Sequence, residues 1–467
     1  MSDGPKRQKV GRTHRFAALS LAVTAMLVTG GCKTFSDHTR ATRSALDASD
    51  LDGALRATNR ALDVKRAENL PDSLRKNDAL LLLDRAMVLQ ARGEYQWSSR
   101  DFQVADKAIE ILDFSRSTGD EIVRYMFSDS AGPYKARPYE KLMLNTMNMI
   151  NYLAPGNLEG ARVEARRFSV MRDYLLGAEK ADKEAVMRAG VPGSYLAGYV
   201  FEKSRAPDAA LRYYDEVLQA AEAPSLTEPI RRLAEVSGYR TPRLQSVMGA
   251  APDGTSTSND AAEVLIVISY GRIPALVAQR VPIGFALTIA AAFLSPVAIQ
   301  QARRMAAQGL VTWINYPDLP PSPSEYPAPS VTIDGQAHPA QVIADVDAVA
   351  RQAWAESKGR VMAAAVTRML TRAAVGAGAG VAVGQATGKG GIGVLASMIT
   401  QASMAAADKP DTRSWATLPA RIAVVRAELP PGQHVVEVTV LGRRHRLETT
   451  IGASEWVLVD VSQLSTR

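Results

Sequence analysis

The spacing of apolar residues predicts an almost continuous series of helices over the first half of the chain. From Phe35 to Leu244, apolar residues recur at steps of three and four, and few segments alternate as strands do. Such spacing puts the apolar side chains on one face of a helix. We therefore expect a mainly α fold in which these helices bury their apolar faces against one another.

One pattern recurs four times within this helical region. A turn containing Gly or Asp is followed by a small residue, and then by an aromatic residue or Leu at helical spacing. The turns lie at 51–55, 93–95, 156–158 and 206–210, and the equivalent small residues are Ala54, Ser98, Ala161 and Ala210. Small residues let paired helices approach closely, while an aromatic residue fills the space between neighbouring pairs.

These segments resemble the second helices of tetratricopeptide repeats, and residues 78–91 and 139–153 fit the preceding helices. The intervals between the small residues are 44, 63 and 49, whereas a regular array repeats every 34 residues. The resemblance implies a divergent set with longer connections and an extra helix around 180–187. The alternative is a helical bundle with an accidental likeness. Under both interpretations, function would come from a groove or a face.

After residue 242 the pattern changes from helices to a mixture of strands and helices. Residues 242–260 are rich in Gly, Pro and Ser, which indicates a linker. Strands are predicted at 262–270, 310–314 and 330–333, an extended loop at 317–329 and a helix at 345–372. Four more strands are predicted at 420–428, 434–441, 444–451 and 456–461, with turns at Pro430–Gly432 and at Gly442.

The predicted architecture is a TPR-like helical repeat domain followed by an α+β region that ends in a small β-sandwich-like module. The boundaries are 1–31 for a leader, 32–245 for the repeat domain, 246–261 for the linker, 262–408 for a mixed strand and helix region with Gly-rich apolar helices, and 409–467 for the β module.

The first residues have the composition of an export signal. Basic residues precede an uncharged stretch at 16–28, and Thr29, Gly30 and Gly31 lead to Cys32. This resembles the bacterial lipoprotein signal, although the family usually has Leu where Thr29 stands. The resemblance implies cleavage before Cys32, acylation of that residue with fatty acids such as palmitate, and anchoring to a membrane. In lipoproteins of this type an Asp directly after the cysteine retains the protein in the inner membrane, so by resemblance Lys33 implies sorting to the outer membrane. The periplasmic face is expected rather than the cell surface. The alternative is an ordinary secretory signal.

Two apolar stretches could contact a membrane. Between 373 and 407 the only charge is Lys389, and glycines stand four residues apart, at Gly376, Gly380, Gly384 and Gly388. This resembles a glycine zipper, whose small residues permit close helix association and imply a membrane-inserting or oligomerising hairpin. The alternative is a buried helix pair. The run at 281–299 is interrupted by Pro and Gly, so a buried helix is favoured over a membrane helix.

Composition and charge further limit the kinds of partner and site that we expect. The chain has 55 basic and 48 acidic residues, and part of the excess lies in the leader, so nucleic acid is not a predicted partner. Cys32 is the only cysteine and the five histidines are scattered, so we expect no metal site, no cofactor and no enzymatic activity. Arg162 and Arg166 lie one helical turn apart and are candidates for binding an acidic partner or glycan. The alternative for this pair is a solvated helix face.

Taken with the segment Asp411–Trp415, these features resemble a family of bacterial lipoproteins with tetratricopeptide-like repeats. The resemblance implies an address in the cell envelope rather than a reaction. The predicted function is a lipid-anchored scaffold that binds envelope proteins. The alternative is a membrane-inserting oligomer, built on the Gly-spaced helices, within an export or assembly system. An enzyme acting on cell-wall material would require a polar cleft with converging acid and base groups.

Overall fold

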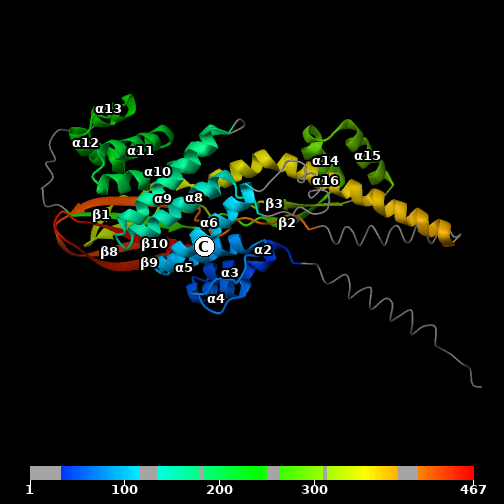
Figure 1. Ribbon diagram of the computed structural model, residues 1–467, viewed down its shortest axis with the longest axis horizontal. Helices are drawn as coiled ribbons and strands as arrows, with labels where there is room; N and C mark the ends of the chain where they lie inside the picture. Colours follow the sequence, from blue (N-terminus) through cyan, green and yellow to red (C-terminus); the bar gives the residue numbers. More distant parts are fainter. Residues whose placement is uncertain (1–32, 115–133, 179–181, 250–261, 309–312, 388–408) are drawn as a thin grey trace, which may run out of the picture.

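Helices occupy the first half of the chain, as the apolar spacing predicted (Figure 1). The computed structural model describes residues 33–114, 134–178, 182–249, 262–308, 313–387 and 409–467. The helical elements of the first half are α2 (Phe35–His38), α3 (Arg40–Asp47), α4 (Leu51–Ala61), α5 (Asp78–Ala91), α6 (Tyr95–Phe114), α8 (Pro138–Leu153), α9 (Leu158–Leu176), α10 (Lys183–Lys203), α11 (Pro207–Ala220), η2 (Pro224–Leu226), α12 (Thr227–Val236) and α13 (Pro242–Gly249).

Three consecutive hairpins form the main part of this helical array. Helix α5 packs against α6, α8 against α9, and α10 against α11. The connections are tight because the residue that ends each turn has a left-handed backbone, at Gly93, Gly156 and Arg205. The four small residues of the repeat pattern, at positions 54, 98, 161 and 210, are all fully buried. The recurring pattern therefore marks equivalent buried positions, and its identity as tetratricopeptide repeats stays a prediction.

Aromatic residues and glycines bring neighbouring helices into close contact. A Cβ atom added at Gly198 of α10 would lie 2.3 Å from the Tyr214 ring of α11. A Cβ at Gly193 would lie 2.2 Å from the ring of Phe168 on α9. These separations are far shorter than van der Waals contact, so the packing requires residues without a side chain at both positions.

Two predicted details of this region are wrong. The extra helix expected around 180–187 is the beginning of the long helix α10, which starts at Lys183 and continues to Lys203. The first residues of the expected linker form α13 instead, in which Leu244 is buried. The rest of that linker lies outside the described residues. In both segments, apolar side chains pack against neighbouring helices, and the sequence alone does not show which helices are neighbours.

The described residues that follow contain ten strands, and most of them lie where strands were predicted. They are β1 (Ala262–Tyr270), β2 (Val277–Pro282), β3 (Trp313–Asp318), β4 (Ser330–Ile333), β5 (Gln336–His338), β6 (Gln341–Asp345), β7 (Arg421–Leu429), β8 (Gly432–Val440), β9 (Arg443–Ile451) and β10 (Trp456–Gln463). Sheet A has the strand order β10-β1-β7-β6, sheet B pairs β2 with β3, and sheet C has the order β5-β4-β8-β9. Strands β2, β5 and β6 were not predicted.

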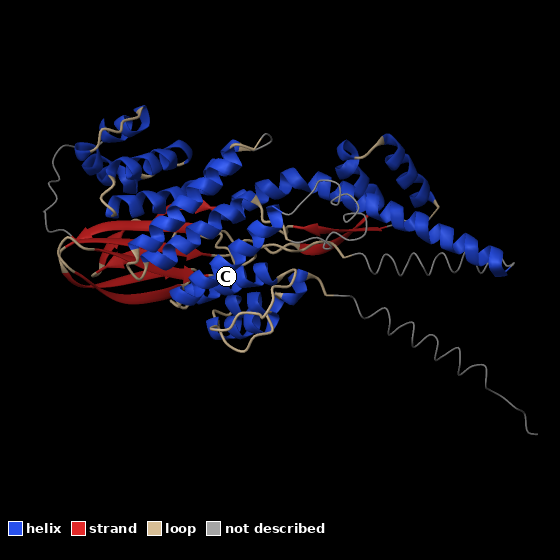
Figure 2. Ribbon diagram, viewed as in Figure 1, coloured by secondary structure: helices blue, strands red, loops and turns tan. Residues whose placement is uncertain are grey.

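Sheet A is the middle layer between the helices and sheet C (Figures 1 and 2). Strand β1 is buried along its whole length. Its residues Val264, Ile266 and Ile268 pack in one core with sheet C, and Leu265 and Val267 pack in another core with the helices. A strand covered on both faces requires an uninterrupted apolar run, which β1 has from Val264 to Ile268.

The strands of the C-terminal segment do not form sheets of their own. In sheet A, β1 pairs in parallel with β10 and antiparallel with β7. In sheet C, β8 pairs with both β4 and β9. The expected β-sandwich is present, but strands from both the 262–408 and the 409–467 segments build each of its layers. A boundary at residue 409 therefore divides strands that share hydrogen bonds.

The remaining elements form a lobe with a third core. Sheet B, α14 (Ile283–Ala290), η3 (Ala291–Phe293) and α15 (Pro296–Ala307) pack on the long helix α16 (Val346–Thr387). Residues 281–299, expected as one buried helix, instead form the end of β2, helix α14, the short helix η3 and the first turn of α15. Helix α14 is buried on one side. Among the described residues, no helix combines the length and apolar character needed to cross a membrane. Gly376, Gly380 and Gly384 belong to α16, and Gly388 lies outside the described residues.

Candidate protein-binding face

Helix α9 has an apolar stripe on its exposed face. Val163, Val170 and Tyr174 are 53%, 71% and 70% exposed. They are spaced by seven and four residues, so they lie on one side of the helix at two-turn and one-turn intervals. Three large apolar side chains in line within one helix differ from the scattered single exposures that are ordinary on protein surfaces.

Arg166 belongs to the same face, between Val163 and Val170. Its side chain is exposed and has no hydrogen bond or ion pair with the described residues. Arg162 is half-buried and donates to Glu159 at 3.3 Å. Of the two arginines proposed from the sequence as partner-binding residues, the structure leaves only Arg166 unpaired. We call Val163, Arg166, Val170 and Tyr174 the α9 stripe.

The opposite face of α9 holds the stripe in its outward orientation. Ala161, Ala165 and Phe168 are fully buried, and the Phe168 ring fills the space left by the glycines of α10. At the N-terminus of the helix, the Asn157 side chain accepts a hydrogen bond from the Gly160 amide at 2.9 Å. Rotation of α9 would remove these contacts, so the stripe is a fixed feature of the surface.

Arg167, next in sequence to Arg166, has a structural role. Its guanidinium pairs with Asp106 of α6 and lies 3.5 Å from Glu164. Glu164 in turn accepts a hydrogen bond from Asn145 of α8 at 3.0 Å. This chain of contacts joins three helices, so Arg167 links α9 to its neighbours while Arg166 remains available at the surface.

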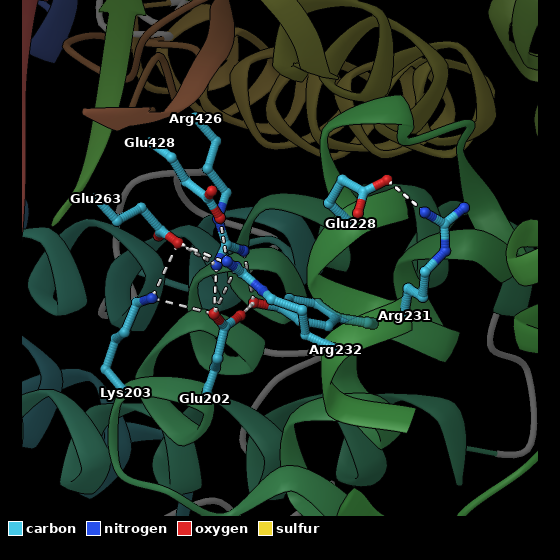
Figure 3. A network of polar contacts seen from close by, with 9 residues as sticks. Glu202, Lys203, Glu228, Arg231, Arg232, Glu263, Arg426 and Glu428 are labelled. Atoms are coloured by element: carbon cyan, nitrogen blue, oxygen red, sulfur yellow. Dashed lines mark hydrogen bonds and ion pairs between the residues drawn. The ribbon is translucent and has the colours of Figure 1, made fainter. Parts of the chain in front are cut away.

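The largest buried ionic network joins the helical array to sheet A (Figure 3). Arg426 of β7 pairs with Glu202 of α10 and, at 3.0 Å, with Glu263 of β1. The Lys203 ammonium lies 3.0 Å from Glu202 and 3.1 Å from Glu263. Arg232 of α12 extends the network at its exposed edge.

The charges in this network compensate one another, and the pKa of Glu202 is lowered as a result. Burial raises the pKa of Glu202, but the Arg426 and Lys203 charges, together with hydrogen bonds from Arg426 and Tyr214, outweigh burial and lower its pKa to about 2. The Tyr214 hydroxyl also donates to Glu202, at 2.6 Å. A carboxylate that is fully paired is poorly suited to accept or release protons near neutral pH. We therefore interpret the network as a joint between layers.

A second buried connection involves the segment at 411–418, which has no helix or strand. Trp415 is fully buried and packs edge-on against Phe102 of α6, with ring centroids 5.8 Å apart. The Thr417 hydroxyl donates to Asp84 of α5 at 2.8 Å, and the Trp415 amide donates to Glu140 of α8 at 3.2 Å. Sequence analysis had noted this segment only for its family resemblance, and its physical role is to hold three helices together.

The described part of the chain contains no group of three or more His, Cys, Asp or Glu residues placed to hold a metal ion. Cys32, the proposed lipidation site, lies outside the described residues.

The α9 stripe was not predicted from the sequence because the opposite face of α9 carries the stronger apolar signal. A second apolar row at 163, 170 and 174 was visible in the sequence and is the signal that would have found it. Comparison of the chain with family models, curated proteins and solved structures gives no match.

Proposed function

We propose that this protein is a lipid-anchored cell-envelope scaffold that binds a partner protein through the α9 stripe. The observation that carries the proposal is the row of exposed Val163, Val170 and Tyr174 beside the unpaired Arg166. Aromatic, aliphatic and arginine side chains together are the composition of energetically important interface residues. The other side of the helical array is occupied by sheet A, which leaves the outward face of α9 for a partner.

The chemistry of the stripe defines the partner in general terms. An apolar patch on the partner would cover the valines and Tyr174, and a carboxylate at its edge would pair with Arg166. Removing the apolar side chains from water supplies affinity, and the charge pair mainly supplies orientation. A protein surface satisfies both requirements, whereas a glycan would leave the valines in water.

The proposed anchor at Cys32 would hold the body close to the membrane. Phe35 is already part of the helical core, and the Ser36 amide donates to the Thr412 hydroxyl at 3.0 Å. Phe35 is three positions after Cys32 in the chain, and an extended chain of that length spans about 10 Å. A scaffold attached in this way would present the α9 stripe at a nearly constant height above the bilayer.

Photo-cross-linking in cells tests the binding face. The cross-linking amino acid p-benzoylphenylalanine is placed at Val170 in the full chain, and the control is the same substitution at Val236. The control is matched because Val236, on α12, is 74% exposed and Val170 is 71% exposed. We expect a discrete adduct from position 170 and none from position 236.

The adduct then identifies a partner whose binding can be measured with purified proteins. Val170→Asp places a charge in the middle of the stripe and should weaken binding at least about 30-fold, equivalent to about 2 kcal/mol. Val236→Asp should leave the affinity unchanged. Equal adducts from both positions, or equal affinities for both Asp variants, would rule out the α9 stripe as the binding face.

Membrane fractionation tests the anchor separately. Cys32→Ala, exported through an ordinary cleavable signal, is compared with the parent after an alkaline carbonate wash. We expect the variant in the soluble fraction and the parent in the pellet, because acyl chains supply the attachment. A folded variant that stays in the pellet would contradict the scaffold and would favour the membrane-inserting oligomer.

A further inference from the structure

The lobe formed by sheet B, α14, η3, α15 and the adjoining part of α16 has an unusual surface. It lies at one end of the long axis of the molecule (Figure 1). Phe285, Phe293, Val297 and Trp313 are 51%, 49%, 73% and 45% exposed. These residues come from four successive elements of the lobe, so the exposure of large apolar side chains is a property of the lobe as a whole.

Helix α14 shows why this surface is not an ordinary solvated one. Its inner residues Ile283 and Leu287 are buried against α16, while Phe285 and Thr288 on the outer side face solvent. No residue from 281 to 299 carries a charge. A helix without charged residues is usually covered on most sides, and here Phe285 on the outer side has no cover among the described residues.

The segment from β2 to Pro317, which forms the lobe apart from α16 and Asp318, carries only positive charge. Between Glu263 and Asp318 the chain has four arginines and no acidic residue or lysine. Arg303 and Arg304 of α15 are exposed and have no ion-pair partner among the described residues. The Arg280 guanidinium lies 5.6 Å from the centre of the Trp313 ring. Exposed aromatic residues combined with unpaired arginines are typical of surfaces that bind the interface of an anionic bilayer.

An open cleft adds a place for an apolar group beside a positive charge. It has a volume of about 350 Å³ and lies between α14 and α15, with Leu287 and Ile299 among its apolar lining residues and Arg303 beside them. An acyl chain fits the apolar lining, and the phosphate of the same lipid would be within the reach of an arginine side chain.

The base of the lobe is close to the start of the body. The Ser36 amide of α2 donates to Thr412 at 3.0 Å, and the Leu276 amide, just before β2, donates to Ser414 at 3.2 Å. Thr412 and Ser414 are two residues apart, so the chain that follows Cys32 and the base of the lobe are held by the same short segment. An acylated Cys32 would therefore place the lobe beside the bilayer.

We propose that the lobe is a second membrane-binding element, which lies on an anionic phospholipid surface with its exposed aromatic residues in the interface and Arg303 and Arg304 against the phosphates. The placement of the lobe beside the bilayer rests on the proposed lipidation of Cys32. The exposed apolar residues and the positive charge of the lobe are independent of that lipidation. A second copy of the chain is a poorer occupant, because it would bring the same unpaired arginines against this face and like charges repel.

Vesicle flotation of unlipidated protein tests this proposal without the anchor. The chain from residue 32 onward, carrying Cys32→Ser, is mixed with vesicles of phosphatidylglycerol and phosphatidylcholine or of phosphatidylcholine alone. We expect binding to the anionic vesicles, weak binding to the neutral ones, and loss of the difference at high salt. Arg303→Gln with Arg304→Gln should weaken partitioning roughly 30-fold, since each arginine near an anionic surface contributes about fivefold.

Matched variants separate the lobe from general effects of charge and apolar surface. The charge control is Arg444→Gln with Arg446→Gln on β9, where both side chains are more than half exposed. The apolar test is Phe285→Ser, with Val236→Ser on α12, where the side chain is 74% exposed, as its control. Only Phe285→Ser should reduce binding, by about tenfold. Neither control should change partitioning.

Three outcomes would overturn the proposal: equal binding to both vesicle types, equal weakening by the two arginine pairs, or self-association in solution that the lobe variants abolish. The last outcome would identify a second copy as the occupant. None of them bears on the cross-link at Val170, so failure of the lobe proposal is distinguishable from failure of the proposed scaffold.

Discussion

Replacing Arg426 with Met is expected to loosen the joint between the helical array and sheet A. The methionine side chain keeps much of the apolar stem of Arg426 but removes the guanidinium that contacts Glu202 and Glu263. Both carboxylates belong to residues less than a tenth exposed. The change therefore leaves negative charge in a site that water does not readily reach.

The charges of the network set the size of the effect. Glu202, Glu263, Lys203 and Arg426 have no net charge as a group, and the variant leaves one uncompensated negative charge. Removing one partner of a buried ion pair costs about 3–5 kcal/mol. The Arg232 side chain is 35% exposed and lies 3.3 Å from Glu263, so it can offset part of this cost. We expect a loss of about 3 kcal/mol in the free energy of unfolding.

Urea denaturation followed by circular dichroism measures this loss, and its pH dependence checks the cause. In the parent, the pKa of Glu202 is about 2, below its ordinary value, so the stability it contributes is present above about pH 5 and is lost as pH falls toward 2. In the variant the remaining carboxylates should have raised pKa values. The deficit of the variant should therefore shrink as pH is lowered from 7 to 5.

A second substitution tests charge compensation directly. Adding Glu263→Gln to Arg426→Met restores neutrality and should recover part of the lost stability. Arg444→Met on β9, where the side chain is 69% exposed, should change stability by less than about 0.5 kcal/mol. The reasoning is refuted if Arg426→Met costs less than about 1 kcal/mol, or if the double variant is no more stable than the single one.

Three further changes probe the body of the protein, each measured as a free energy of unfolding in urea. Burial raises the pKa of Asp84 to about 7, above its unfolded value of about 4. As pH rises from 4 to 7, the parent should therefore lose up to about 4 kcal/mol of unfolding free energy relative to Asp84→Asn. Parallel pH profiles of the two proteins would contradict this. Trp415→Ala should cost about 3–5 kcal/mol because it leaves a cavity at a fully buried site; a cost below about 1 kcal/mol would show that the site collapses. Gly198→Ala should cost about 1–3 kcal/mol because the added Cβ would clash with the Tyr214 ring. The control Gly284→Ala, where nothing lies within 4 Å of the added Cβ, should be neutral or slightly stabilising. Equal effects of the two substitutions would disprove close packing at Gly198.

The proposed binding face shows which features can be predicted from local sequence patterns and which cannot. The spacing of Arg162 and Arg166 pointed to α9, the helix of the proposed binding face, but these arginines and Arg167 are chemically alike in the sequence. Their contacts in the folded protein differ. Arg167 pairs with Asp106 of another helix and Arg162 pairs with Glu159 one turn away, whereas Arg166 has no ion pair with the described residues. Likewise, α9 has two apolar faces, and the glycines of α10 decide which of them is buried.

The sequence by itself determined the local elements of this protein. The bounds of β1 and β4 agree with those predicted, and the turns at Gly93 and Gly156 lie where the repeat pattern placed them. This agreement has a local cause, since the periodicity of side chains and the left-handed backbone of a glycine act over only a few residues.

Only the tertiary structure decided which elements are neighbours. Strand β1 pairs in parallel with β10, with Glu263 opposite Trp456, although most of the C-terminal half of the chain lies between them. Strand pairing uses backbone groups that every strand possesses, so the choice of partner depends on which apolar faces are buried together. The same packing covers sheet A with helices and leaves the α9 stripe and the lobe with the exposed apolar surfaces on which the proposed functions depend.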